Sequence, residues 1–186
     1  MNEFVRTYAF DASPQRAENI VNHPGVDKIL LRSKLTRGDF GTLPEELRIS
    51  AASVEIGANK FSPKSALLAK ISETIEYFAI SEIVLSRRSE VILVGAIFPS
   101  CKVVLKIGSQ RNLKNFEQWV RATPNLRFSV LVDCDLLTSR SIVDSLLTYS
   151  VPVLADQVEE VEHALELKSW GVSEIVSPHI SVLNAI

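Results

Sequence analysis

Cysteine is scarce in this chain of 186 residues, and its two cysteines, Cys101 and Cys134, form no CxxC pair. Two such thiols make neither a disulfide framework nor a zinc cluster, so we expect a reduced protein in the cytoplasm. The longest uninterrupted apolar run, residues 91–98, is far shorter than the ~20 residues of a membrane-spanning helix. Charged residues interrupt the first twenty positions, so we expect no secretory signal and no membrane partner.

Glycine-rich nucleotide motifs are also absent. No GxGxxG follows the first apolar segment, so nothing there indicates a dinucleotide site. What the chain does have is an ordinary globular composition, with 46% hydrophobic and 23% charged residues. The length suits one domain over residues 1–186, which is large enough to bury most of its apolar surface.

The net charge of −2 is unevenly distributed. Residues 1–121 contain 17 Lys and Arg against 13 Asp and Glu, whereas residues 122–186 contain 3 against 9. Such an asymmetry favours a cationic binding face in the first part of the chain. A surface on which charges are distributed without function remains the alternative.

A unit of strand, helix and strand is clearest in residues 151–178. An apolar run ends at Asp156, an amphipathic segment follows, Gly171 ends the helix, and a second apolar run closes at Pro178. A connection of this length is typical of a parallel crossover. The unit recurs, because the tetrapeptide SEIV at residues 81–84 is repeated at residues 173–176.

Counting such units along the chain predicts eight strands, most of them rich in Val, Ile and Leu. They cover residues 4–10, 28–33, 49–56, 82–85, 102–107, 128–132, 151–155 and 174–176. Helices are expected over residues 14–23, 63–78, 90–97, 113–122, 139–149, 158–168 and 179–186, although the apolar run in residues 91–98 would equally suit a strand. We therefore predict a compact (β/α)8 TIM-like barrel, with an open doubly wound parallel sheet as the alternative.

In either architecture, functional side chains belong at the carboxyl ends of the strands. The strand ends in the first part of the chain are basic, and arginine and lysine there suit the phosphates of a nucleic-acid backbone. Few aromatic residues are interleaved, which favours recognition of RNA shape over base stacking. The candidate RNA-binding residues are Lys34, Arg37, Lys60, Lys64, Arg87, Arg88, Arg111 and Lys114.

The other strand ends are acidic. Asp11, Asp133, Asp135 and Asp156 offer the carboxylate oxygens that Mg²⁺ or Mn²⁺ prefers, which would suit a metal-dependent phosphohydrolase or an aldolase-like lyase. The competing interpretation is that Asp135 and Asp156 cap the helices that follow them. Cys134 lies between two aspartates, which raise a thiol pKa, so we interpret it as structural.

The segment IVLSRRSEVILVGAIFPSCKVVLKIGS, residues 83–109, resembles protein component 3 of archaeal and eukaryotic ribonuclease P, the thirty-kilodalton TIM-like barrel subunit. The layout of residues 27–35 and 49–62 is also similar to that family. The resemblance implies a non-catalytic subunit without a cofactor, which binds RNA and partner proteins in precursor-tRNA 5′ processing. No DNA partner is expected.

The chain departs from that family in two respects. Its pI of about 6.0 is low for the family, and residues 157–165 lack the arginine that the family tends to carry after the seventh strand. The closing strand, helix and strand also resemble glycerophosphodiesterase-like barrels, but YAFDAS stands at residues 8–13 in place of the HRG of that family.

Overall fold

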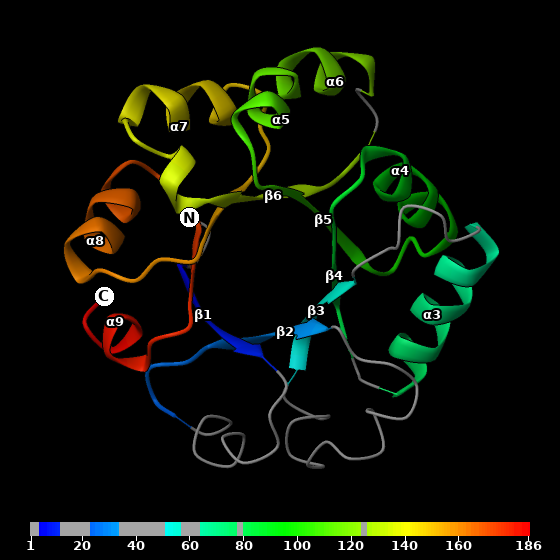
Figure 1. Cartoon of the computed structure of the whole chain (residues 1–186), viewed down its shortest axis with the longest axis horizontal. Coiled ribbons are helices and arrows are strands. Elements are labelled where there is room, and N and C mark those ends of the chain that lie inside the picture. The colour runs from blue at the N-terminus through cyan, green and yellow to red at the C-terminus, as the bar shows by residue number, and fades with distance from the viewer. Residues whose placement is uncertain (1–3, 12–22, 34–50, 57–63, 78–79, 124–125) are drawn as a thin grey trace.

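The computed structural model describes residues 4–11, 23–33, 51–56, 64–77, 80–123 and 126–186. Its strands are parallel and form a closed barrel in chain order, with β1 pairing with both β2 and β8 (Figure 1). They are β1 (Val5–Asp11), β2 (Lys28–Ser33), β3 (Ala51–Ile56), β4 (Glu82–Leu85), β5 (Lys102–Ile107), β6 (Ser129–Asp133), β7 (Val153–Asp156) and β8 (Glu174–Ser177). The predicted (β/α)8 barrel is therefore confirmed, and the open doubly wound sheet is wrong.

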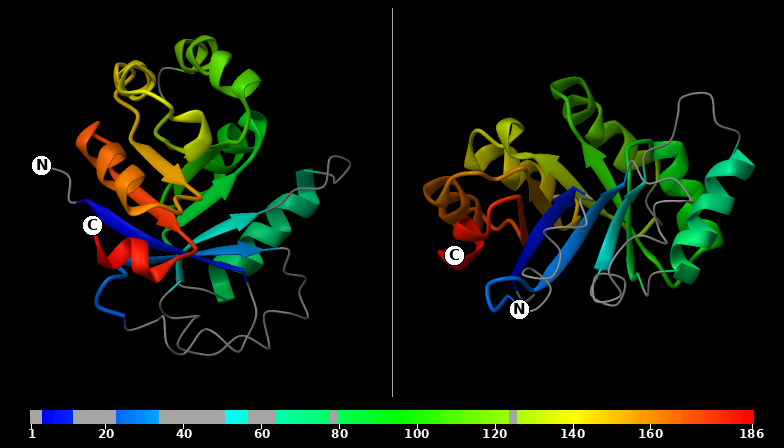
Figure 2. Two further views of the ribbon diagram at one scale, coloured as in Figure 1. Left: turned by 60° about the vertical axis from the view of Figure 1, so that its left-hand side comes forward. Right: turned by 60° about the horizontal axis from the view of Figure 1, so that its bottom comes forward.

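Helices lie outside the ring of strands and cover it from the flank (Figures 1 and 2). In the described residues they are α3 (Lys64–Tyr77), α4 (Arg88–Ile97), α5 (Gln110–Lys114), α6 (Phe116–Ala122), the 3-10 turn η2 (Cys134–Leu136), α7 (Arg140–Leu147), α8 (Val161–Ser169) and α9 (Ile180–Asn184). The last helix, α9, packs beside β1 and β8 and so covers the seam at which the barrel closes.

Successive side chains of each strand point to opposite faces of the barrel wall. One set joins the helices in the main core, which includes Ile83, Leu105 and Val132. The other set points into the barrel, where seven apolar side chains form a middle layer: Ala9, Leu30, Val84, Val104, Leu131, Leu154 and Val176. The interior is thus a packed core, as expected for a barrel of eight strands.

Charged side chains lie above and below this apolar middle layer. On β2 the inward positions read Lys28, Leu30 and Arg32, and on β5 they read Lys102, Val104 and Lys106. Each of these two strands therefore places one cation at its amino end and one at its carboxyl end. The barrel interior consists of an amino-end ionic layer, an apolar layer and a carboxyl-end ionic layer.

The amino-end ionic layer is centred on Lys28. Its Nζ lies 2.9 Å from Oε1 of Glu82 and 2.6 Å from Oε1 of Glu174. Thr7 donates a hydrogen bond to Glu174 (2.7 Å) and Ser53 donates one to Glu82 (3.0 Å). Hydroxyl and ammonium donors thus surround both buried carboxylates, which offsets part of the cost of removing them from water.

The predicted strand positions agree with the structure to within two residues wherever the residues are described. Gly171 has a φ of +98° after α8, as expected for a glycine that ends a helix. One helix was placed wrongly. Residues 113–122 do not form one helix, because Ser109 accepts a hydrogen bond from the Asn112 N–H and starts α5 at Gln110, and the chain bends at Asn115 before α6.

Some predicted segments lie outside the described residues, including residues 14–22 of the first predicted helix and the first two residues of the third predicted strand. Among the helices of the described part, none combines the length and apolar character needed to cross a membrane.

Candidate active site at the carboxyl ends of the strands

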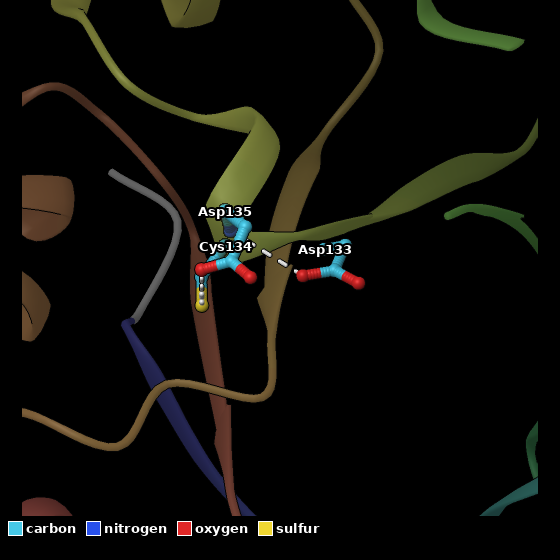
Figure 3. Close-up of side chains that lie close together, drawn as sticks. All are labelled: Asp133, Cys134 and Asp135. Atoms are coloured by element: carbon cyan, nitrogen blue, oxygen red, sulfur yellow. Dashed lines mark hydrogen bonds between the residues drawn. The ribbon is translucent and has the colours of Figure 1, made fainter. Parts of the chain in front are cut away.

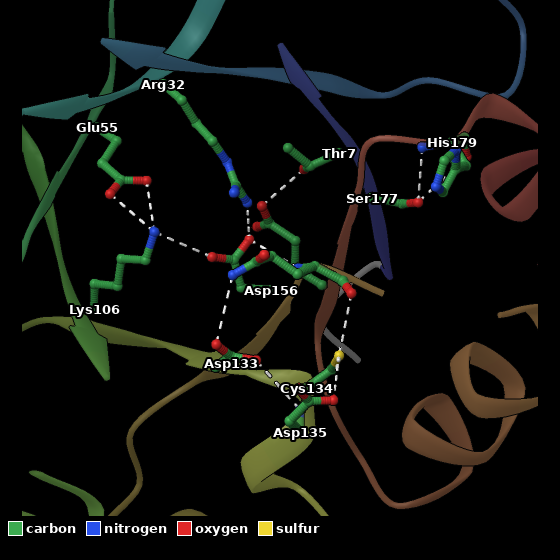
Figure 4. A network of polar contacts seen from close by, with 12 residues as sticks. Thr7, Arg32, Glu55, Lys106, Asp133, Cys134, Asp135, Asp156, Ser177 and His179 are labelled. Carbon is green, nitrogen blue, oxygen red and sulfur yellow. Dashed lines mark hydrogen bonds and ion pairs between the residues drawn. The ribbon is translucent and has the colours of Figure 1, made fainter. Parts of the chain in front are cut away.

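Four charged side chains from four different strands meet in the carboxyl-end ionic layer (Figure 4). Nζ of Lys106 on β5 lies 2.9 Å from both carboxylate oxygens of Glu55 on β3 and 3.3 Å from Oδ2 of Asp156 on β7. The guanidinium of Arg32 on β2 forms an ion pair with Oδ1 of the same Asp156. We call these four residues the mouth cluster.

Asp156 is the centre of the mouth cluster and is fully buried, with a side-chain exposure of 0%. Burial raises the pKa of Asp156 above its usual value, although the charges of Arg32 and Lys106 oppose that rise. The side chains of Arg32, Lys106 and Glu55 are each 19–20% exposed. Asp156 is therefore inaccessible to a ligand, whereas its three partners retain a solvent-facing edge.

Gln157 links the mouth cluster to the end of β6. Its φ of +59° lies in the left-handed region, which is uncommon for a residue with a side chain. In this conformation the Gln157 N–H donates to Oδ1 of Asp156 (2.9 Å), and its carbonyl accepts from the Cys134 thiol (3.1 Å). Both contacts hold the turn after β7, so the backbone of Gln157 fixes the Asp156 carboxylate.

Asp133, at the end of β6, and Asp135 lie on either side of Cys134 in the sequence (Figure 3). Asp133 caps η2 by accepting from the Asp135 N–H (3.3 Å). The expectation that Asp135 and Asp156 cap the following helices is wrong. The residue before α7 is Ser139 and the residue before α8 is Glu160, whereas Asp156 pairs with cations inside the barrel.

In the described part of the chain, the candidate metal ligands do not form a suitable site for Mg²⁺ or Mn²⁺. Asp133, Cys134 and Asp135 place potential ligand atoms within 4.8 Å of one another. Yet Cys134 is a buried thiol, a poor ligand for hard cations such as Mg²⁺, and two cations already neutralise Asp156. The side chain of Asp11 is outside the described residues. These residues therefore do not support a metal-dependent step.

Both cysteines should react slowly in the folded protein. Burial, with nearby carboxylates as a smaller cause, raises the pKa of both Cys101 and Cys134 to about 11. A thiol with a pKa of about 11 instead of 9.0 has about a hundredfold less thiolate at pH 8. We expect iodoacetamide to label the native protein about a hundredfold more slowly than the urea-unfolded protein, as measured by mass spectrometry. Equal labelling rates would contradict the buried position of Cys134 and the partly buried position of Cys101.

Of the candidate RNA-binding residues, Lys34, Arg37 and Lys60 lie outside the described part of the chain. Lys64 is exposed at the first position of α3, and Arg111 and Lys114 are exposed on α5. Arg87 and Arg88 precede and begin α4, where Nη2 of Arg88 donates to the Asn112 carbonyl (3.2 Å). The structure thus brings the arginines of the β4 end beside α5, next to the mouth cluster.

A cavity of about 340 Å³ opens beside the mouth cluster at the carboxyl ends of β4 and β5. It is lined by residues 86–89, residues 105–107 and Asn112. Arg87, Arg88 and Lys106 are its charged lining residues, so the cavity has a cationic wall. We call it the β4–β5 pocket.

Sequence reasoning missed Arg32, Glu55 and Lys106, because it considered residues beyond the strand ends and not those inside the strands. A signal was available. Each of these charges interrupts an apolar strand at an inward position, two residues from another inward side chain.

Comparisons with known proteins define the fold and no family. No protein-family model and no curated protein sequence matches the chain. Among solved structures, a glycerol uptake operon antiterminator-related protein from Thermotoga maritima is 11% identical, with a TM-score of 0.69 over 99% of each chain. A glycerophosphodiester phosphodiesterase from Thermotoga maritima is 10% identical, with a TM-score of 0.66 over 99% of this chain and 98% of that one.

Phosphoribosylanthranilate isomerase from Thermotoga maritima is similar to the same extent, with 10% identity and a TM-score of 0.67 over 98% of this chain and 95% of that one. At such identities the resemblance is one of architecture. Together with the closed parallel barrel, these likenesses establish that the chain is a (β/α)8 TIM-barrel protein.

Proposed function

We propose that this protein is an enzyme that performs general acid–base chemistry on a small anionic substrate at the carboxyl-end mouth of its barrel. One observation carries the proposal: two cations and two carboxylates from four strands meet inside the barrel at the end where TIM-barrel enzymes have their active sites. Buried ion pairs contribute little net stability compared with apolar packing, so such a cluster suggests a functional role.

The amino-end ionic layer offers an internal comparison. There the side chains of Lys28, Glu82 and Glu174 are 13%, 5% and 6% exposed. In the mouth cluster, Lys106, Glu55 and Arg32 are 19–20% exposed. Lys102, at the rim of the amino-end layer, is 52% exposed, and Asp156 of the mouth cluster is fully buried. The remaining side chains of the mouth cluster are each more exposed than Lys28, Glu82 and Glu174, which supports a structural role for the amino-end layer and a chemical role for the mouth cluster.

Lys106 and Glu55 are the proposed catalytic residues. Two carboxylates hold Nζ of Lys106 at the mouth, at distances of 3.3 Å or less, where its positive charge can stabilise negative charge on a substrate oxygen in the transition state. Glu55, the more accessible carboxylate, accepts or returns a proton. Asp156 positions Lys106 through their ion pair, and Arg32 pairs with the other oxygen of the same carboxylate and so holds Asp156 in place.

This chemistry favours a lyase or isomerase type of reaction, with proton transfer next to a carbonyl group, over metal-dependent phosphohydrolysis. The described carboxylates do not provide a free set of hard ligands, because Asp156 is neutralised by Arg32 and Lys106. The likeness to a phosphodiesterase barrel supports an enzyme at the level of the fold.

A ligand screen tests the proposal. Phosphorylated and carboxylated metabolites are scored by the rise in melting temperature of the whole chain, because a ligand that binds the native state stabilises it. Stabilising compounds are then incubated with the protein and analysed by mass spectrometry for turnover. We expect at least one anionic compound to be converted. If no compound is converted and every stabilising compound also stabilises a Lys106→Met variant, the mouth cluster is not an active site.

A second candidate is a non-catalytic RNA-binding subunit of ribonuclease P in the cytoplasm, working with partner proteins. The favouring observation is a set of exposed cations on α5, Arg111 and Lys114, beside Arg88. Filter binding of precursor tRNA and of the processing RNA, alone and with partner subunits, decides it. Affinity that falls steeply with salt, and falls further in Arg111→Ala, supports this candidate. Affinity that does not change with salt concentration excludes the RNA-binding candidate.

A further inference from the structure

We propose that the β4–β5 pocket is the subsite for a phosphate monoester group of the substrate, with Arg88 as its principal charge partner. The inference rests on the proposed function, which it extends by naming the substrate class. TIM barrels that bind phosphate commonly use the loops after β7 and β8. Here β7 ends at Asp156, and the N–H of the next residue, Gln157, donates a 2.9 Å hydrogen bond to the Asp156 carboxylate. This N–H is therefore not free to bind a phosphate. The cationic cavity lies across the barrel, at β4 and β5.

The size of the pocket suits a small ligand. A volume of about 340 Å³ falls at the lower end of the ~300–1,000 Å³ range of small-molecule sites. Lys106 belongs both to the pocket lining and to the mouth cluster. A substrate with its phosphate in the pocket therefore extends past Lys106 toward Glu55, where the proposed chemistry takes place.

Arg88 carries the charge that the pocket does not neutralise. Arg87 has a carboxylate partner, because its Nη1 lies 3.4 Å from Oε1 of Glu90, and Lys106 is paired with Glu55 and Asp156. Arg88 contacts no carboxylate among the residues that the structure describes. Its contacts there are the Asn112 carbonyl at 3.2 Å and the ring of Trp119, whose centroid is 5.7 Å from Cζ.

These two contacts hold the Arg88 guanidinium in place without cancelling its charge. A cation stacked on an indole face and bound to a carbonyl keeps further N–H donors for an anion. Arginine donors match the oxygens of a phosphate in a bidentate geometry. Ser86 and Ser89, which also line the pocket, add hydroxyl donors. The site thus offers a fixed charge and neutral donors, which a dianionic monoester uses more fully than a singly charged diester.

Trp119 provides a direct readout, because an anion on Arg88 changes the electrostatic field at the stacked indole ring. The chain has two tryptophans, so Trp170→Phe leaves Trp119 as the single tryptophan, which is excited selectively over the tyrosines. In this background, inorganic phosphate and phenyl phosphate are titrated against potassium chloride at matched ionic strength. Calorimetry repeats each titration, because it does not depend on the indole.

We expect saturable phosphate binding in the millimolar range, tighter binding of phenyl phosphate, and at least about a tenfold loss of affinity in Arg88→Gln, since a charge-assisted contact is removed. If circular dichroism shows that Arg88→Gln is unfolded, Arg88→Lys, which keeps the charge, replaces it in the comparison. Arg140→Gln is the matched control. It removes the same charge from α7, is 68% exposed and does not line the pocket, so it should bind phosphate unchanged.

Equal affinities of the parent and Arg88→Gln overturn the inference, as does a response that chloride reproduces. Binding of a uridine oligonucleotide without binding of either phosphate probe also overturns it and favours the RNA candidate. The two proposals fail separately. If the screen yields turnover of a compound without a phosphate, and inorganic phosphate does not bind, the subsite is wrong and the enzyme stands. If phosphate binds through Arg88 but no compound is turned over, the subsite stands and catalysis fails.

Discussion

Replacing Lys28 with Met is expected to destabilise the protein by about 3–5 kcal/mol, because it removes the cation that Glu82 and Glu174 share and leaves Glu82 with only the half-exposed Lys102. Glu82 and Glu174 are 5% and 6% exposed, and Nζ of Lys28 lies within 2.9 Å of both. Burial disfavours the charged form of Lys28, but the attraction of Glu174 and Glu82 outweighs it and raises the pKa of Lys28. Urea denaturation at pH 7 measures the loss.

A triple variant separates the loss of a partner from the loss of packing. Lys28→Met combined with Glu82→Gln and Glu174→Gln also removes the two buried negative charges and should recover most of the stability. The sign of the pH dependence is also fixed. Since the folded-state pKa of Lys28 lies above its usual 10.5, its contribution is fully present at neutral pH and is lost only as the pH rises through that higher value. A cost below about 1 kcal/mol for the single variant, as for a surface pair, would contradict the buried geometry.

The barrel was predictable because its signal is local. Each strand is a short apolar run with a turn signal at its end, and the helix that follows supplies the remainder of the unit, so units are counted from the sequence alone. Gly171 illustrates this, since a glycine after an amphipathic segment predicted the left-handed helix end that the structure has. The bend at Asn115 was missed because the apolar pattern of residues 113–122 predicts one continuous helix. In the structure, the Ser109 cap starts a separate helix, α5, before that pattern begins.

The candidate site was less predictable because its contacts are not local. Lys106 meets Glu55 across 51 positions of sequence, and Arg32 meets Asp156 across 124. Which charged residues share a layer depends on the register of several strands at once, and a shift of one residue turns a side chain to the opposite face. Asp156 was therefore identified as a candidate, but its cationic partners were not, and its interpretation as a helix cap or metal ligand followed from that omission.

Replacing Lys106 with Met is expected to lower kcat for the substrate found by the screen by about 10²–10⁴-fold, because it removes the ammonium that Glu55 and Asp156 hold at the mouth. Arg88→Gln should instead raise KM and leave kcat close to that of the parent, because phosphate binding is common to the ground and transition states. Steady-state kinetics on both variants separate the two roles.

Lys102 supplies the control, because it lies on the same strand and the same inward face as Lys106 but at the opposite end of the barrel. Its Nζ pairs with Glu82 at 3.0 Å and its side chain is 52% exposed, so Lys102→Met removes an identical group without touching the mouth cluster. Its kcat should match that of the parent. If Lys102→Met and Lys106→Met reduce kcat equally, the effect comes from the barrel as a whole and the mouth cluster has no special role. A loss confined to Lys106→Met, with a melting temperature close to that of Lys102→Met, assigns the chemistry to the carboxyl end of β5.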